Sequence, residues 1–148
     1  MHRLMPMALA IFALFPFGAN AQTAANCPTL PADSGLKWDV LDGPGFLFCK
    51  ALRADGSEAF AVTLSADSPF KPKRSDRAEQ TSIDGRPTYW YASEIAGQTK
   101  VIARETLVDV EGGNVAHISL RAGDQDQAQQ IMGQVQSLTF RDARLSSN

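Results

Sequence analysis

The sequence is poor in the residues that metal sites and cysteine- or histidine-based catalysis require. It has two cysteines and two histidines, and because His2 lies in the N-terminal segment, His117 is the single imidazole in the body of the chain. One imidazole and two thiols supply too few nitrogen or sulfur ligands for a transition-metal site. No serine or cysteine lies in a motif that marks it as a nucleophile activated by His117. We therefore expect no metal, no cofactor and no catalytic constellation.

The chain also lacks the excess of positive charge on which nucleic-acid binding depends. Its 14 lysines and arginines are outnumbered by 16 aspartates and glutamates, so the formal net charge is −2. Affinity for DNA or RNA rests largely on the neutralisation of phosphates, and no nucleic-acid-binding motif is present. We expect no nucleic-acid partner.

Beyond its first residues the chain has no apolar run long enough to cross a membrane, which takes about 20 residues. The N-terminal apolar run, residues 4–17, is itself too short and contains two prolines. A basic start at Arg3 precedes this run, and the small residues Ala19 and Ala21 follow at the positions that an export peptidase reads. We predict a signal peptide over residues 1–21 and a soluble bacterial protein of the periplasm or the medium, without stable membrane insertion.

The two cysteines, Cys27 and Cys49, are predicted to form a disulfide. An exported protein meets oxidising conditions, and a single pair of cysteines in such a chain most simply forms one bridge. The bridge would tie a leader, residues 22–35, to the strand that carries Cys49 and would stabilise the fold by about 3 kcal/mol. A redox or nucleophilic cysteine is the alternative, but the chain has no C-x-x-C spacing and nothing that marks either thiol as activated.

Residues 36–148 read as a single domain of short strands that ends in a helix. Two Asp-Gly pairs, at 55–56 and 84–85, separate strand-like segments and favour hairpins, because glycine accepts the positive φ of the turn. Residues 66–80 contain two prolines and four basic residues, which indicates a surface crossover with one helical turn after Ser75. The other links are short, so neighbouring strands should pair antiparallel.

The C-terminal segment predicts an amphipathic helix. Its apolar stripe consists of Ala128, Ile131, Met132, Val135 and Leu138, and most other positions are glutamine. Asp124 is placed to cap the first turn. We predict an α+β fold, an antiparallel meander of about six to seven strands with this helix packed on one face. One helix covers only one face, so the N-terminal strands, the 66–80 crossover or another protein must cover the other.

Residues 80–140 carry a resemblance to a known family. The succession "IDGRPTYWYASE", a hairpin in "VIARETLVDVEGGNVAHISLRA" and the closing "DQDQAQQIMGQVQSLTF" resembles the second half of exported bacterial proteins of the DcrB type, which belong to the wider PsbP/Mog1-like fold. The resemblance implies an antiparallel sheet flanked by helices, and a ligand-binding or accessory role rather than an enzyme. The family has no catalytic signature, so the resemblance assigns no functional residue.

Three consecutive aromatic residues, Tyr89, Trp90 and Tyr91, lie in the middle of the chain. Adjacent side chains on a strand point to opposite faces, so the three do not form one binding platform. Both faces of this strand are apolar, which favours a strand covered on both sides. Binding in an adjacent pocket is the alternative.

The polar residues of the last two strands form the first candidate site. His117, Ser119 and Arg121 share one face of a strand, and Arg104 and Glu105 interrupt otherwise apolar stripes of the neighbouring strand. A charge inside such a stripe is either paired or lies at a wet end of the sheet. These five residues predict a polar patch that binds an anion or a partner, with a solvated sheet face as the alternative.

The second candidate site is the basic run in the 66–80 crossover. It consists of Lys71, Lys73, Arg74 and Arg77. If functional, this run would meet anionic lipid, an anionic polymer or an acidic protein surface. The alternative is a solvated loop.

These features predict a non-enzymatic envelope protein that binds a partner protein or a small ligand through its sheet or the crossover. A specific form of this hypothesis is an inhibitor or immunity protein that blocks a secreted hydrolase. The alternative from another class is an envelope hydrolase that uses carboxylates such as Glu94 or Glu105, because acidic residues near aromatic ones suit sugar chemistry.

Overall fold

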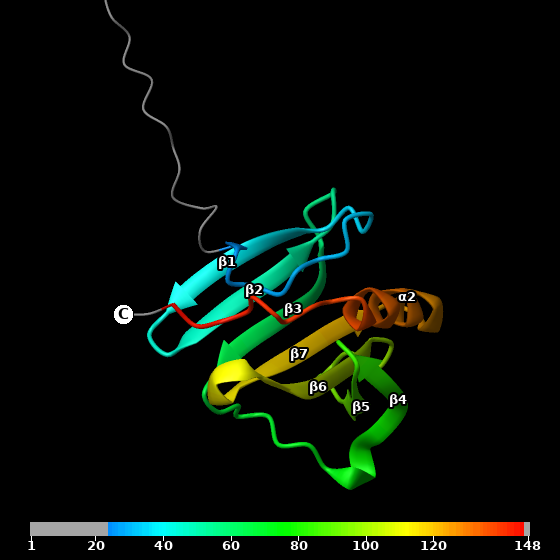
Figure 1. The fold of residues 1–148 in the computed structure, drawn as a ribbon. Helices are drawn as coiled ribbons and strands as arrows, with labels where there is room; N and C mark the ends of the chain where they lie inside the picture. The colour runs from blue at the N-terminus through cyan, green and yellow to red at the C-terminus, as the bar shows by residue number, and fades with distance from the viewer. Residues whose placement is uncertain (1–23, 147–148) are drawn as a thin grey trace, which may run out of the picture.

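The computed structural model describes residues 24–146, so the predicted signal peptide lies outside the described residues. It contains a seven-stranded sheet and a helix, α2 (Gln125–Gln136), as Figure 1 shows. The strands are β1 (Lys37–Gly43), β2 (Phe46–Leu52), β3 (Glu58–Ser65), β4 (Arg77–Ile83), β5 (Arg86–Ser93), β6 (Ile102–Val110) and β7 (Asn114–Ala122). Two 3-10 turns, η1 (Arg74–Asp76) and η2 (Glu111–Gly113), precede β4 and β7. The predicted α+β class is confirmed.

The sheet consists of two antiparallel meanders that meet at its centre. In the strand order β1-β2-β3-β7-β6-β5-β4, every neighbouring pair is antiparallel. Residues 66–73 and η1 carry the chain from β3, in the middle, to β4, at the far edge (Figure 1). The predicted crossover is therefore present but shorter than expected, because Arg77 already begins β4. The expected helical turn is η1, which includes Ser75 rather than following it.

The two Asp-Gly pairs mark hairpins, as predicted. Asp84 and Gly85 both have positive φ, 49° and 73°, which suits a tight turn matched to the twist of the strands. The Asp84 carboxylate also accepts a hydrogen bond from the backbone N–H of Phe140 at 3.1 Å, which ties the C-terminal segment to this turn. At the other hairpin, the Asp55 carboxylate accepts a hydrogen bond from the backbone N–H of Ser57 at 2.9 Å.

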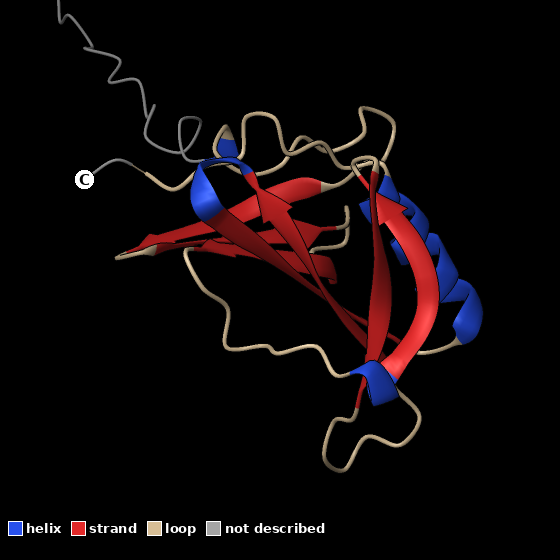
Figure 2. Ribbon diagram, turned by 60° about the horizontal axis from the view of Figure 1, so that its bottom comes forward, coloured by secondary structure: helices blue, strands red, loops and turns tan. Residues whose placement is uncertain are grey.

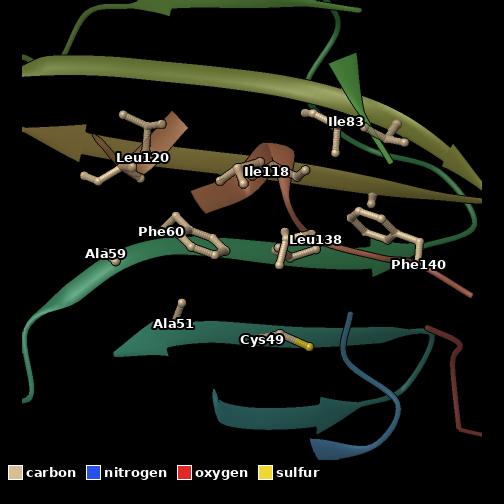
Figure 3. Packing of buried hydrophobic residues seen from close by; sticks show 14 of the residues in the cluster. Cys49, Ala51, Ala59, Phe60, Ile83, Ile118, Leu120, Leu138 and Phe140 are labelled. Atoms are coloured by element: carbon tan, nitrogen blue, oxygen red, sulfur yellow. The ribbon is translucent and has the colours of Figure 1, made fainter. Parts of the chain in front are cut away.

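One face of the sheet carries the hydrophobic core. Directly paired residues of antiparallel strands share a face, and the pair formed by Phe60 and Leu120 is buried there. Figure 3 shows these two side chains with Ile118 of β7 and with Leu138 and Phe140, which follow α2. Each large apolar side chain buried in this way stabilises the fold by about 1.5–3 kcal/mol.

The helix α2 packs on this core face with its apolar stripe inward. Asp124 caps it as predicted, because its carboxylate accepts a hydrogen bond from the backbone N–H of Gln127 at 2.8 Å. The buried residues of the helix are Ala128, Ile131, Met132 and Val135. The helix ends at Gln136, so Leu138 reaches the core from the turn after the helix, where its backbone N–H donates to the carbonyl of Val135 at 3.1 Å, and not from the helix itself. Within residues 24–146, no helix has both the length and the apolar character needed to cross a membrane.

The N- and C-terminal segments cover the rest of the core face. Cys27 and Cys49 form the predicted disulfide, and both residues are buried. Thr29 and Thr139 form a backbone bridge with N···O distances of 2.9 and 3.3 Å. The leader is therefore held covalently to β2 and by hydrogen bonds to the segment after α2.

The opposite face of the sheet, which we call the open face, is crossed by residues 66–73. Figure 2 shows this crossover on the side of the sheet away from α2. Phe70 of the crossover contacts the rings of Tyr91 and His117, with centroid distances of 6.0 and 5.1 Å. Trp90 is buried on the core face and Tyr91 on the open face. The aromatic run therefore packs on both faces, as predicted, and the crossover supplies part of the second cover.

Candidate functional site

The open face carries most of the polar side chains that the sequence singled out. The strand register places Glu105 of β6 between Ser119 of β7 and Tyr91 of β5, and directly paired residues share a face. His117 and Arg121 lie two residues on either side of Ser119, so they point to the same face. Four of the five residues of the predicted polar patch therefore lie on one surface.

Arg104 does not belong to this patch, because adjacent residues on a strand point to opposite faces. It pairs with Leu120 across the strands and so lies on the core face. Its guanidinium binds Glu79 of β4, with Nε 2.8 Å from Oε2 and Nη2 2.9 Å from Oε1. These hydrogen bonds hold the pKa of Glu79 below its ordinary value, against the opposing effect of partial burial. Arg104 thus satisfies the expectation that a charge in an apolar stripe is paired.

His117 and Glu105 form a hydrogen-bonded pair near the middle of the open face. His117 Nε2 lies 2.9 Å from Glu105 Oε1, and the two side chains are 20% and 26% exposed. The ring of Phe70 stacks on the imidazole, with an angle of 14° between the planes. The imidazole is therefore held between a carboxylate and an aromatic ring. Among the described residues, no serine or threonine hydroxyl is hydrogen bonded to it.

A groove crosses one end of the open face. It consists of three adjoining hollows of about 540, 230 and 290 Å³. The first lies in the β5–β6 loop, the second over β6 and β7, and the third beside the start of β3. Ser93 and Glu94 line both the first and the second hollow, and Ser119 and Arg121 line both the second and the third. We call this connected surface the end groove.

The end groove contains one guanidinium among carboxylates. Arg121 is exposed where the second and third hollows meet, and it forms no ion pair with any described residue. Glu94 lines the groove on the β5 side of Arg121, and Glu58 lines it on the β3 side. Glu105 lies between them but is already paired with His117. Along the groove, the charged groups without a described ion-pair partner are therefore the carboxylate of Glu94, the guanidinium of Arg121 and the carboxylate of Glu58, in that order.

The four residues of the predicted basic run lie in three different environments. Lys71 pairs with the carboxylate four residues before it at 2.8 Å, and both groups are exposed. Lys73 and Arg74 are exposed at the turn before β4 and form no ion pair with a described residue. Arg77 lies in β4 with its guanidinium 4.4 Å from the centre of the Tyr89 ring, a cation–π contact. We call Lys73 and Arg74 the basic turn.

Glu58, Phe70 and Glu79 were not predicted, because the residues they contact lie far away in the sequence. Glu58 follows the first Asp-Gly turn, and its approach to Arg121 depends on the pairing of β3 with β7. The sequence offered one indication that Phe70 packs against the sheet, because it is an apolar residue between two prolines in an otherwise polar crossover. Glu79 carried none, because its partner Arg104 lies 25 residues away in the sequence.

No family model, no curated protein and no solved structure matches this chain. The resemblance of residues 80–140 to DcrB-type proteins therefore stays a prediction. Residues 24–146 contain no group of three or more histidine, cysteine, aspartate or glutamate side chains arranged to hold a metal ion.

Proposed function

We propose that this protein is an exported, non-enzymatic binding protein of the bacterial envelope that holds an extended peptide segment of a partner protein in the end groove. The observation that carries the proposal is the groove, in which three connected hollows cross four strands and present charges of both signs. The signal pattern of residues 1–21 and the disulfide between Cys27 and Cys49 support export.

The length of the end groove suits a short linear segment. The groove crosses β5, β6, β7 and β3, which are neighbours in the sheet. Three interstrand steps of about 4.8 Å each span roughly 14 Å. An extended chain advances about 3.3 Å per residue, so about four residues of a partner lie in the groove.

The charges of the end groove define the chemistry of that segment. Arg121 offers a planar pair of donors to a carboxylate. Glu94 and Glu58, on either side of Arg121, accept hydrogen bonds from ammonium or guanidinium groups. The best-matched segment therefore has an acidic side chain between two basic ones. Because these groups are exposed, their attraction is weakened by salt.

The proposal is tested with a set of fluorescent hexapeptides in which an acidic residue lies between lysines, with neutral and charge-inverted peptides as references. We expect Arg121→Ala to weaken binding of the matched peptide about tenfold, since a hydrogen bond to a charged group contributes about 1.5–3 kcal/mol. Lys50→Ala is the matched control, because Lys50 is on the open face but outside the groove and pairs with Asp39 at 3.7 Å. That variant should bind like the wild type.

Two results contradict the proposal. One is that no peptide of the set binds, and the other is that Arg121→Ala binds as tightly as the wild type. The double variant Lys73→Glu, Arg74→Glu tests the basic turn as the competing surface. If this variant loses binding while Arg121→Ala retains it, the partner binds at the basic turn and not in the end groove.

Identification of the partner uses affinity capture from envelope extract and culture medium, with the wild type and Arg121→Ala compared side by side. A protein that the wild type captures and Arg121→Ala does not is the expected partner. If that partner is a secreted hydrolase that loses activity in the complex, the protein is its inhibitor.

A further inference from the structure

The two edges of the sheet differ in how well they suit pairing with a further strand. The edge strands are β1 and β4 (Figure 1). The register between β4 and β5 shifts between Arg77 and Gln80, and such an irregularity disfavours the addition of a strand to β4. By contrast, β1 pairs with β2 in continuous register over all seven of its residues. The regular edge of the sheet is therefore the outer side of β1.

The outer side of β1 presents backbone donors and acceptors that have no partner. The turn at residues 44–45 separates Gly43 from Phe46, so this flanking pair is joined by the hydrogen bond of the turn. Hydrogen-bonded pairs alternate along an antiparallel ladder. The backbone N–H and C=O groups of Trp38 and Val40 therefore point away from β2, and no described residue outside the sheet is hydrogen bonded to them.

The side chains of this edge are apolar on the core face, and they are incompletely covered. Leu36, Trp38 and Val40 pack against the core, but all three stay partly exposed. The indole of Trp38 is held in place, because its Nε1 donates to the backbone oxygen of Pro28 at 2.8 Å and its ring contacts that of Phe60. A strand added to β1 would cover these apolar side chains further.

The open face of the same strand carries one charge of each sign, on Lys37 and Asp39. Both side chains are exposed, and the carboxylate of Asp39 is 3.7 Å from Nζ of Lys50 in β2. Exposed charges on an edge strand usually oppose association with another chain. Two opposite charges on alternate residues, however, attract their counterparts in an antiparallel copy of the same strand.

The charges select one register for two antiparallel copies of β1. When Trp38 faces its own counterpart across a two-fold axis, Lys37 of each copy faces Asp39 of the other. On the core face, Val40 of each copy then faces Leu36 of the other. An axis at Val40 would leave both charges without a counterpart, and an axis at Asp39 would set the two carboxylates against each other. The favoured axis therefore passes through Trp38.

This axis lies on the row of paired residues that leads to the end groove. Trp38 pairs with Ala51, and Ala51 pairs with Phe60. Phe60 pairs in turn with Leu120, which lines the second and third hollows of the groove. A two-fold axis perpendicular to the sheet keeps the open faces of both copies on the same side. The two grooves then lie on one face of the joined sheet, on opposite sides of the axis.

We propose that this protein forms a reversible homodimer in which β1 of each copy pairs antiparallel with β1 of the other about Trp38. The backbones exchange hydrogen bonds at Trp38, and Lys37 of each copy forms an ion pair with Asp39 of the other. A contact of one strand from each copy is small, below about 1,200 Å², so we expect dissociation in the micromolar range or above. The dimer does not depend on the end groove, but the display of two peptide segments on one face rests on the proposed function.

Sedimentation velocity of residues 22–148 over a range of protein concentrations tests the dimer. We expect the wild type to associate reversibly. Lys37→Asp and Asp39→Lys each set like charges against each other on both sides of the axis, so each should raise the Kd of the dimer about tenfold. The matched control is Lys73→Asp, because Lys73 of the basic turn is exposed and lies before β4, at the other edge. This control should associate like the wild type.

Charge exchange tests the register. The double variant Lys37→Asp, Asp39→Lys restores opposite charges across the axis and should associate with the Kd of the wild type. An equimolar mixture of the two single variants should form a heterodimer, because each charge again faces one of opposite sign. Arg121→Ala should dimerise normally, and Lys37→Asp should bind the matched hexapeptide like the wild type. Dimerisation and peptide binding in the end groove can therefore fail separately.

Three outcomes overturn the proposal. The first is that the wild type stays monomeric up to about 1 mM, the limit of weak association. The second is that the two single variants associate as the wild type and Lys73→Asp do, which places the contact elsewhere on the surface. The third is that the double variant and the mixture associate no better than the single variants, which rules out the register about Trp38.

Discussion

The disulfide between Cys27 and Cys49 should contribute a large part of the stability of this fold. The two cysteines are 22 residues apart in the sequence, and closing a loop of that length removes enough entropy from the unfolded chain to stabilise the fold by about 3 kcal/mol. Cys49 is completely buried, so replacing it with alanine leaves a space about the size of a methyl group, which costs about 1 kcal/mol more. We therefore expect about 3 kcal/mol from reduction and about 4 kcal/mol from the Cys27→Ala, Cys49→Ala variant.

Urea unfolding followed by circular dichroism measures this effect. With a slope of about 2 kcal/mol per molar urea, the midpoint should fall by about 1.5–2 M. A domain that is stable by about 5–15 kcal/mol remains folded after such a loss. The variant without cysteines is the control for the reductant, because its midpoint should not respond to reduction.

The structure also predicts which backbone amides lose protection from hydrogen exchange first when the disulfide is reduced. Thr29 and Thr139 exchange two backbone hydrogen bonds, and the disulfide is the covalent tie that holds the Thr29 segment in place. Reduction should therefore accelerate hydrogen exchange at these two amides more than at Ile118 in the centre of the sheet. A loss of stability below about 0.5 kcal/mol on reduction, or no change in exchange at Thr29, would refute the view that the bridge fastens the leader to the sheet.

Two further predictions concern residues that line the hollow of about 180 Å³ between α2 and β4, on the core side of the sheet beside Trp90. Gly133→Ala should raise the free energy of unfolding by about 1 kcal/mol, since the added Cβ meets no atom within 4 Å and alanine favours the helix, and an unchanged or lower urea midpoint would contradict this. Glu79 has a lowered pKa in the folded protein because Arg104 donates to it, so its stabilising effect is fully present above the ordinary value of 4.5 and is lost as the pH falls through the lowered one. Glu79→Gln should be less stable than the wild type at neutral pH and should lose less stability between about pH 5 and pH 3; parallel stability curves for the two proteins would rule out this role.

Much of the secondary structure follows from local patterns. The alternation in β7 identifies Ala116, Ile118 and Leu120 as core residues, and all three are buried. The apolar stripe and Asp124 identify α2 and its start. The end of α2 could not be predicted, because Leu138 continues the helical spacing although the helix ends two residues before it. Burial of Leu138 is compatible with either conformation, so spacing alone does not distinguish them.

The candidate site was predictable only in part. Alternation places His117, Ser119 and Arg121 on one face, and it also requires Arg104 and Glu105 to point to opposite faces. Grouping Arg104 with the other four was therefore an error that the rule of alternation corrects. The ion pairs themselves were not predictable, because each partner comes from a different strand and the register between strands is set by the whole sheet.

By itself, the sequence determined the elements of this protein, namely its hairpins, its amphipathic helix and its paired cysteines. These features depend on the spacing and chemistry of residues close together in the chain. The tertiary structure alone decided that β4 lies at the far edge, that β3 meets β7, and that the crossover covers the open face. The end groove and the hollow at Trp90 arise from these long-range pairings, since their residues come from segments whose contacts depend on the burial of the entire core.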